Sequence, residues 1–227
     1  METENGKPSF STRATRTLVA AYGVIVGVAG IEHGILEVLQ GNVRPAEGPM
    51  IDAIGPAQRF WEYSSEPTLS LIPNFLATGI LAILFGLLVI VWAGWFVQRR
   101  YGAWVFLLLA VILFLVGGGF APIFVTLFGF AAATRIGRPL KLWRRILPGV
   151  VRRIFAALWP WLLVILVPLF AVTVEIAIFG YPLRWLFSAD TLFTIQSTSG
   201  YVMLGLVILC LPAAFAHDIG QQGELNP

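Results

Sequence analysis

The sequence predicts an all-α fold, a polytopic bundle of helices that crosses a lipid bilayer. Hydrophobic residues make up 58% of the 227 residues and charged residues only 12%, whereas soluble domains hold about 45–50% and about 25%. The mean hydropathy of +0.83 agrees with this composition. Long apolar stretches alternate with short charged links, as expected if each stretch is a membrane helix of about 20 residues. We therefore expect lipid to cover much of the apolar surface.

One apolar stretch is too long for a single crossing. Residues 101–134 carry no charge, and as one helix they would be about 51 Å long, against a hydrocarbon core of about 30 Å. Gly117-Gly118-Gly119 and then Pro122 interrupt the stretch, and glycine with proline is the strongest local breaker. We expect a hairpin of two short helices there, and about six crossings in all. The predicted crossings are 17–39, 71–97, 101–116, 122–134, 154–179 and 197–216.

The basic residues indicate the orientation of these crossings. Twelve of the fifteen Lys and Arg residues lie in the N-terminal arm and in the links at 98–100 and 135–153. The hairpin puts all three segments on one side, and Lys and Arg mark cytoplasmic loops. We therefore expect cytoplasmic N and C termini, in the plasma membrane. The predicted organisation is a cytoplasmic arm over 1–16, one membrane domain over 17–216 with an outer loop over 40–70, and a cytoplasmic tail over 217–227.

The first apolar stretch also has some features of a signal peptide. Lys7, Arg13 and Arg16 precede it, as in a basic n-region. Val28-Ala29-Gly30 is a poor cleavage site, and the apolar run continues beyond it. We expect this stretch to be retained as a membrane helix, and cleavage within residues 1–30 is the alternative.

Four glycines in the first stretch predict a helix-packing seam. Gly23, Gly27, Gly30 and Gly34 are spaced four, three and four residues apart, so they share one face of a helix. Small residues at such spacing let two helix backbones approach closely within a membrane. The partner is either another helix of this chain or a second copy.

Ionisable residues inside the predicted crossings are the candidate site. His33 and Glu37 are four residues apart and share a face beside the glycine seam, whereas Glu32 points the other way. Glu175 lies at about the same depth as Glu37, in the 154–179 crossing. Charged groups in a bilayer are costly and mark ion or ligand sites. The structural alternative is that Glu32 and His33 form a buried hydrogen-bonded pair, while Glu37 and Glu175 are solvated near the interface.

Two connecting segments are expected to lie at the membrane surface. In the basic cytoplasmic segment 135–153, Lys141, Arg144 and Arg145 fall on one face of an amphipathic helix, which suits anionic lipids of the inner leaflet. A docking site for an acidic partner is the alternative. In the outer loop we expect a short interfacial helix over 50–61.

The sequence excludes several function classes. It has no phosphate-binding glycine loop, no HExxH and no paired-cysteine motif. We expect no cofactor, no structural metal and no nucleic-acid partner; a divalent cation on His33, Glu37 and Glu175 is a weaker alternative. We expect a non-enzymatic membrane protein that acts through helix packing, as an accessory or self-assembling component with a second copy or another membrane protein as partner. The alternative is a proton- or cation-handling channel or transporter with an outward-facing pocket.

Overall fold

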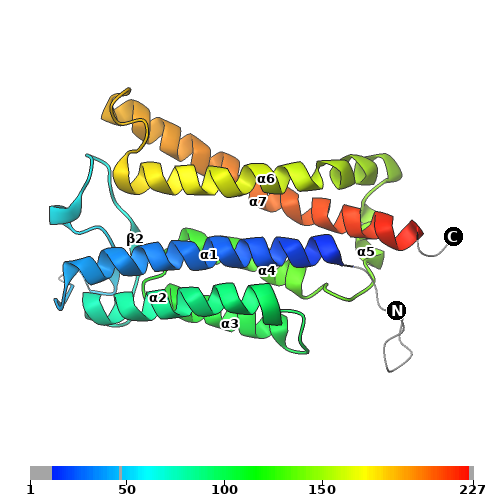
Figure 1. Ribbon diagram of the computed structural model, residues 1–227, viewed down its shortest axis with the longest axis horizontal. Helices are drawn as coiled ribbons and strands as arrows, with labels where there is room; N and C mark the ends of the chain where they lie inside the picture. The colour runs from blue at the N-terminus through cyan, green and yellow to red at the C-terminus, as the bar shows by residue number, and fades with distance from the viewer. Residues whose placement is uncertain (1–11, 46–47, 225–227) are drawn as a thin grey trace.

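Six helices follow the long axis of the molecule and run alternately in opposite directions (Figure 1). The computed structural model describes residues 12–45 and 48–224. The six helices are α1 (Arg13–Gln40), α2 (Phe75–Val91), α3 (Gly102–Leu115), α4 (Ala121–Ala133), α6 (Gly149–Phe179) and α7 (Ala189–Glu224). The other elements are strands β1 (Met50–Asp52) and β2 (Pro67–Leu69), the 3-10 helix η1 (Pro56–Gln58), the π-helical turn η2 (Trp92–Phe96) and α5 (Lys141–Ile146). The predicted all-α class is confirmed, because the two strands hold only three residues each.

Four of the described helices are long and apolar enough to cross a membrane. They are α1, α2 with its continuation η2, α6 and α7. The helices α3 and α4 are also apolar but have only 14 and 13 residues. At 1.5 Å per residue they measure about 21 and 20 Å, less than the hydrocarbon core. The chain is therefore a helical, multi-pass membrane protein with one pair of short helices.

Three helices extend beyond the predicted crossings. The structure begins α1 at Arg13, α6 at Gly149 and α7 at Ala189, and it ends α7 at Glu224. Hydropathy marks only the part of a helix that suits lipid, whereas its backbone hydrogen bonds continue through charged and polar turns. Lys7, with the rest of residues 1–11 of the predicted arm, and residues 225–227 of the predicted tail lie outside the described residues.

Helix α1 is the centre of the bundle. It contacts α2, α3, α4, α6 and α7, and Figure 1 shows it (blue) between the α2–α3 pair and the α6–α7 pair. In its most apolar window 61% of the residues are buried, against 28% for α2 and for α6. The predicted first membrane helix is thus present as the helix around which the others pack.

The glycine seam of α1 packs against α2 of the same chain. A methyl group placed on Gly27 would lie 2.5 Å from the carbonyl oxygen of Gly86, and one on Gly34 would lie 2.6 Å from that of Gly79. The approach is reciprocal, because methyl groups on Gly79 and Gly86 would meet the carbonyl oxygens of Gly34 and Gly27. Such contact of backbone with backbone is what small residues permit in membranes. The seam continues outside this pair: Gly23 faces Ala93 of η2, and Gly30 faces Leu113 of α3.

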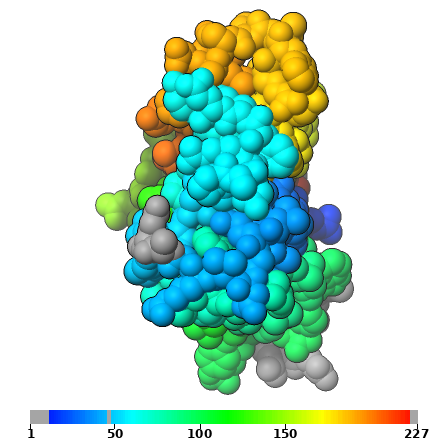
Figure 2. All heavy atoms as spheres, turned by 90° about the vertical axis from the view of Figure 1, so that its left-hand side faces the viewer, coloured from blue at the N-terminus to red at the C-terminus, as the bar shows by residue number. Residues whose placement is uncertain are grey.

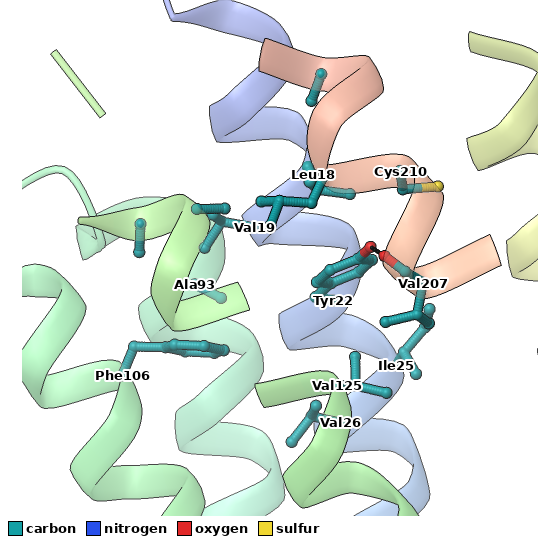
Figure 3. Packing of buried hydrophobic residues seen from close by; sticks show 14 of the residues in the cluster. Leu18, Val19, Tyr22, Ile25, Val26, Ala93, Phe106, Val125, Val207 and Cys210 are labelled. Atoms are coloured by element: carbon teal, nitrogen blue, oxygen red, sulfur yellow. Dashed lines mark hydrogen bonds between the residues drawn. The ribbon is translucent and has the colours of Figure 1, made fainter. Parts of the chain in front are cut away.

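Two hydrogen-bonded contacts join α1 to α7, the last helix. In the apolar core, the Tyr22 hydroxyl donates to the carbonyl oxygen of Val207 at 2.6 Å (Figure 3). At the beginning of α1, the carboxylate of Asp218 accepts hydrogen bonds from the backbone N–H groups of Ala14 and Thr15, at 3.0 and 2.9 Å. An anion at a helix N-terminus satisfies free N–H groups and opposes the helix dipole. Asp218, which falls in the predicted tail, is instead fully buried.

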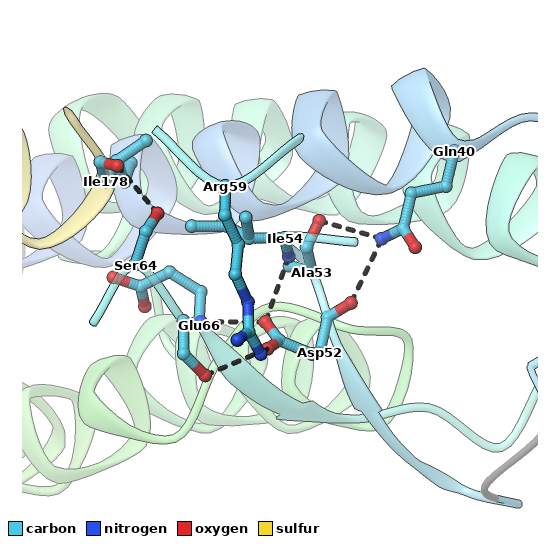
Figure 4. Close-up of polar contacts among 9 residues, drawn as sticks. Gln40, Asp52, Ala53, Ile54, Arg59, Ser64, Glu66 and Ile178 are labelled. Atoms are coloured by element: carbon cyan, nitrogen blue, oxygen red, sulfur yellow. Dashed lines mark hydrogen bonds and ion pairs between the residues drawn. The ribbon is translucent and has the colours of Figure 1, made fainter. Parts of the chain in front are cut away.

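The outer loop forms an ordered cover over one end of the bundle. Figure 2 shows it (cyan) lying between the α6–α7 end and the end of α1. The interfacial helix expected over 50–61 is wrong, because β1 and η1 occupy this stretch and β1 pairs antiparallel with β2. The Asp52 carboxylate accepts from the backbone N–H of Ile54, two residues later, which favours a turn over a helix. The Gln40 side chain at the end of α1 also donates to the carbonyl oxygens of Asp52 and Ala53 (Figure 4).

The basic segment after α4 forms only a short helix, α5. Part of its apolar side faces the bundle: Leu140 and Leu147 are buried, and the Trp143 ring lies 4.9 Å from that of Phe215 on α7, whereas Leu142 and Ile146 are exposed. The predicted basic face is exposed and consists of Lys141, Arg144 and Arg145. It lies at the end of the bundle where both described chain ends lie (Figure 1).

Candidate functional site

A cavity of about 290 Å³ lies between α1, α4, α6 and α7, near the end that the outer loop covers. Most of its wall is apolar and comes from Ile25, Ala29, Val125, Phe170, Val174 and Met203, among others. The ionisable groups on the wall are Glu32 and His33 of α1 and Glu66 of the outer loop. A mainly apolar hollow with a few polar groups at one place is the usual form of a ligand site.

His33 is held in one orientation by its own helix. Its Nδ1 lies 2.8 Å from the carbonyl oxygen of Ala29, one turn earlier. A carbonyl oxygen only accepts, so Nδ1 must carry a proton. The other ring nitrogen, Nε2, is therefore the one that faces the site and can gain or lose a proton.

The partner of His33 is a glutamate that comes from the outer loop. Nε2 lies 3.2 Å from a carboxyl oxygen of Glu66, and the two side chains are only 10% and 20% exposed. With Nδ1–H given to Ala29, a hydrogen bond at this distance needs one proton between Nε2 and the carboxyl oxygen. That proton belongs to an imidazolium or to a carboxylic acid. The pair is thus a proton-binding position at the wall of the cavity.

Glu66 is placed by the loop's own hydrogen bonds. Its backbone N–H donates to the Asp52 carboxylate at 2.8 Å, and its carbonyl oxygen accepts from Ala53 at 2.9 Å. Glu66 is half-buried, and Thr68 of β2 and Ser70, two and four residues later, are buried. Glu66 lies in the predicted outer loop 40–70 and was not among the predicted site residues. The available signal was the alternation of polar residues at 66, 68 and 70, the period of a strand.

The glycine turn between α3 and α4 lies directly on the site. Gly117 and Gly119 have φ of +100° and +82°, which side chains rarely adopt. A methyl group on Gly119 would lie 2.6 Å from Nε2 of His33, and one on Gly117 would overlap the Glu37 carboxyl group. The turn is fixed to β2, because the N–H of Gly119 donates to the Thr68 hydroxyl at 3.0 Å. The glycines thus end α3 and also allow the backbone to reach His33 and Glu37.

Glu37 is the most isolated ionisable group of the site. Its side chain is fully buried, and neither carboxyl oxygen has a hydrogen-bond partner in the described part of the chain. A buried ionised carboxylate without a partner costs several kcal/mol. Glu37 therefore needs a proton, a water molecule or a cation to be stable where it lies.

The structure brings some of the predicted site residues together at the cavity and leaves Glu175 outside its wall. Glu32, half-buried, and His33 share the cavity wall. Glu37 lies one turn further along α1, on the other end of the Gly117–Gly119 turn. Glu175 is exposed on α6 and does not line the cavity, although its carboxylate is near enough to Glu32 to interact with it electrostatically. Among the residues that the structure describes, no group of three His, Cys, Asp or Glu is placed to hold a metal ion.

Neither a protein-family model, nor a curated protein, nor a solved structure matches this chain.

Proposed function

We propose that this chain is a non-enzymatic protein of the plasma membrane that binds and passes a proton or a small cation through an outward-facing pocket. The observation that carries the proposal is the proton-binding pair His33–Glu66, on the wall of a cavity that Glu32 also lines. Histidine changes its charge near neutral pH, and intramembrane carboxylates and histidines commonly relay protons or hold cations. The two carboxylates give the pocket the charge that a cation needs.

The apolar wall of the cavity extends the proposal to organic cations. A bare proton needs no cavity, whereas about 290 Å³ of mainly apolar space suits a small hydrocarbon group. Glu32 and Glu66 would then bind an ammonium group, and Phe170 and Met203 would contact its hydrocarbon part. A protonated amine combines both features in one ligand.

The proposed orientation is six crossings with cytoplasmic termini. The short helices α3 and α4 form the third and fourth crossings, and the outer loop fills the space that their shortness leaves. The support is that the two basic links, 98–100 and 135–153, lie at the same end of the bundle as the start of α1, which carries Arg13 and Arg16 (Figure 1), as expected of a cytoplasmic face. The pocket then lies in the outer half.

The direct test is flux into liposomes that contain the purified protein. We expect proton or methylammonium uptake that is abolished by His33→Ala and by Glu66→Gln, because each removes one half of the pair. The matched control is Glu62→Gln, which removes an exposed carboxylate from the same loop and should leave the rate unchanged. Melting temperatures of all variants check that they fold. Flux at the wild-type rate in folded His33→Ala and Glu66→Gln protein would contradict the proposal.

A second candidate is the accessory or self-assembling role. It is favoured by the use of polar groups away from the pocket for hydrogen bonds within the bundle, such as Tyr22 to Val207, and by the exposed basic face of α5 as a surface for a partner. Because α2 of the same chain covers the glycine seam, a partner would bind another face. Native mass spectrometry of the protein from its own membranes tests this role. A protein adduct or identical copies would support it, and a lone chain would count against it.

A further inference from the structure

A second hollow, of about 510 Å³, lies at the opposite end of the bundle from the His33–Glu66 pair. It lies between the link that joins η2 to α3 and the end of α4. Three arginines line it, Arg99, Arg100 and Arg138, together with Trp104 and Thr134. We propose that this basic hollow binds the phosphate group of an anionic phospholipid.

The charge of the basic hollow has no counterpart in the protein. In the part of the chain that the structure describes, no carboxylate forms an ion pair with Arg99, Arg100 or Arg138. Three neighbouring cations without an anion repel one another. Guanidinium groups also match the geometry of phosphate oxygens, with two parallel hydrogen bonds. An external anion that carries phosphate therefore fits the charge and the donor set.

The walls of the basic hollow are fixed by the fold. The Trp92 indole N–H donates to the carbonyl oxygen of Gly102 at 2.9 Å and holds the start of α3. On the other wall, the N–H of Gly137 donates to the Thr12 hydroxyl at 3.0 Å. The Arg99 guanidinium lies 4.9 Å from the centre of the Phe96 ring, close enough for a cation–π contact. The cations are thus presented by a shaped site and not by a flat, mobile surface.

The membrane side of the hollow favours a lipid over a soluble anion. Trp104 lies on its wall and is 63% exposed, and Leu108, one turn further along α3, is 57% exposed. Residues four apart share a helix face, so an apolar strip leads from the hollow along α3. Tryptophan is enriched at the level of the lipid headgroups, and basic pockets between helices at the cytoplasmic side bind acidic headgroups. A lipid would place its phosphate among the arginines and an acyl chain along this strip.

The chain supplies a matched control for this site. The exposed basic face of α5, Lys141, Arg144 and Arg145, carries the same charge of three. None of these residues lines the basic hollow. Diffuse attraction to an acidic membrane depends on charge alone. It would therefore fall equally whether the three arginines of the hollow or the three basic residues of α5 were neutralised. Only a defined lipid site in the basic hollow would make the two sets of substitutions differ in their effect on lipid binding.

The test is native mass spectrometry of delipidated full-length protein titrated with phosphatidylglycerol, cardiolipin or phosphatidylcholine. We expect tight binding of the two acidic lipids by the wild type. The triple variant Arg99→Gln, Arg100→Gln, Arg138→Gln should bind them about a hundredfold more weakly. This estimate takes about 1 kcal/mol of binding free energy per arginine and a tenfold change in the dissociation constant for each 1.4 kcal/mol. The control triple variant Lys141→Gln, Arg144→Gln, Arg145→Gln removes only diffuse attraction, so it should lose far less binding than the arginine triple variant does.

Three outcomes would overturn the proposal. They are an equal loss in both triple variants, no loss in either, and binding of phosphatidylcholine as strong as that of the acidic lipids. A parallel titration with inorganic phosphate tests whether the bound phosphate group belongs to a lipid or to a soluble anion. If inorganic phosphate binds the wild type as strongly as phosphatidylglycerol, the site serves a soluble anion and the lipid assignment fails. If the triple variant does not fold, the single variant Arg138→Gln decides, with about a fivefold loss expected.

Discussion

At the residue scale, the site depends on one proton and on the backbone that surrounds it. The Nδ1–H of His33 is occupied by Ala29, so the proton between Nε2 and Glu66 is the one that a ligand or a change of pH can displace. Glu37 is close to the same turn, but its carboxyl oxygens have no hydrogen-bond partner among the described residues. The His33–Glu66 pair and Glu37 thus lie at the two ends of the Gly117–Gly119 turn. Because the turn has no side chains, its backbone lies directly against both groups.

Alanine at Gly117 should disturb Glu37 in addition to straining the turn. A left-handed backbone costs roughly 1–2 kcal/mol for a residue with a side chain, and the methyl group also meets the Glu37 carboxyl group. Gly137→Ala is the matched control, because its φ is also positive, +68°, and nothing lies within 4 Å. We expect Gly117→Ala to lower the melting temperature more than Gly137→Ala does.

Combining the glycine change with Glu37→Ala isolates the contact. We expect Gly117→Ala to be less harmful in a Glu37→Ala background than in the wild type, because the overlapping carboxyl group is gone, with a coupling of about 1 kcal/mol or more. Strictly additive effects in the double variant would show that the turn and Glu37 act independently.

At the element scale, hydropathy and glycine spacing could predict most of what the structure contains. The helix hairpin at 101–134 followed from length and from the glycine turn, and the seam followed from the period of the α1 glycines. The sequence could not identify α2 as the partner of the seam. Gly79 and Gly86 are a single pair, seven residues apart, within a uniformly apolar helix. The outer loop was the weakest prediction, since hydrogen bonds between residues far apart in the sequence, such as Asp52 and Glu66, determine its path.

Alanine at Gly27 should push α1 and α2 apart. The added methyl group would lie 2.5 Å from the carbonyl oxygen of Gly86, so one helix must shift and the packed contacts along the seam are lost. We expect a lower melting temperature in detergent and an unchanged oligomeric state by size-exclusion chromatography with light scattering, because the seam lies within one chain.

The control for this change is Gly205→Ala on α7, where nothing lies within 4 Å of the new methyl group. In a helix alanine is more stable than glycine by roughly 0.5–1 kcal/mol, so the melting temperature should stay the same or rise. A change of oligomeric state in Gly27→Ala would show that the seam also binds a second copy.

At the scale of the whole molecule, the two ends of the bundle have different chemistry. One end holds the ordered outer loop and the His33–Glu66 pair, and the other holds the basic links, α5 and the basic hollow. Sequence reasoning could anticipate this asymmetry from the charges of the links. It could not anticipate that Glu66 reaches inward from the loop, because the partner of His33 is 33 positions away in a segment without an apolar pattern.

The asymmetry predicts which positions a membrane-impermeant maleimide reaches in intact cells. In a Cys210→Ser background, we expect Glu62→Cys in the outer loop to be labelled from outside. Pro139→Cys, exposed in the basic link before α5, should be labelled only after the membrane is permeabilised. The opposite result would reverse the proposed orientation and place the pocket in the inner half.

The hydrogen bonds from Ala14 and Thr15 to Asp218 also bear on how the protein is made. They join positions 204 and 203 residues apart, so the carboxylate that completes the start of α1 is synthesised almost last. The start of α1 therefore lacks this partner until α7 is made, whereas α2, which carries Gly79 and Gly86, is the next long helix of the chain. The bundle closes only when α7 arrives.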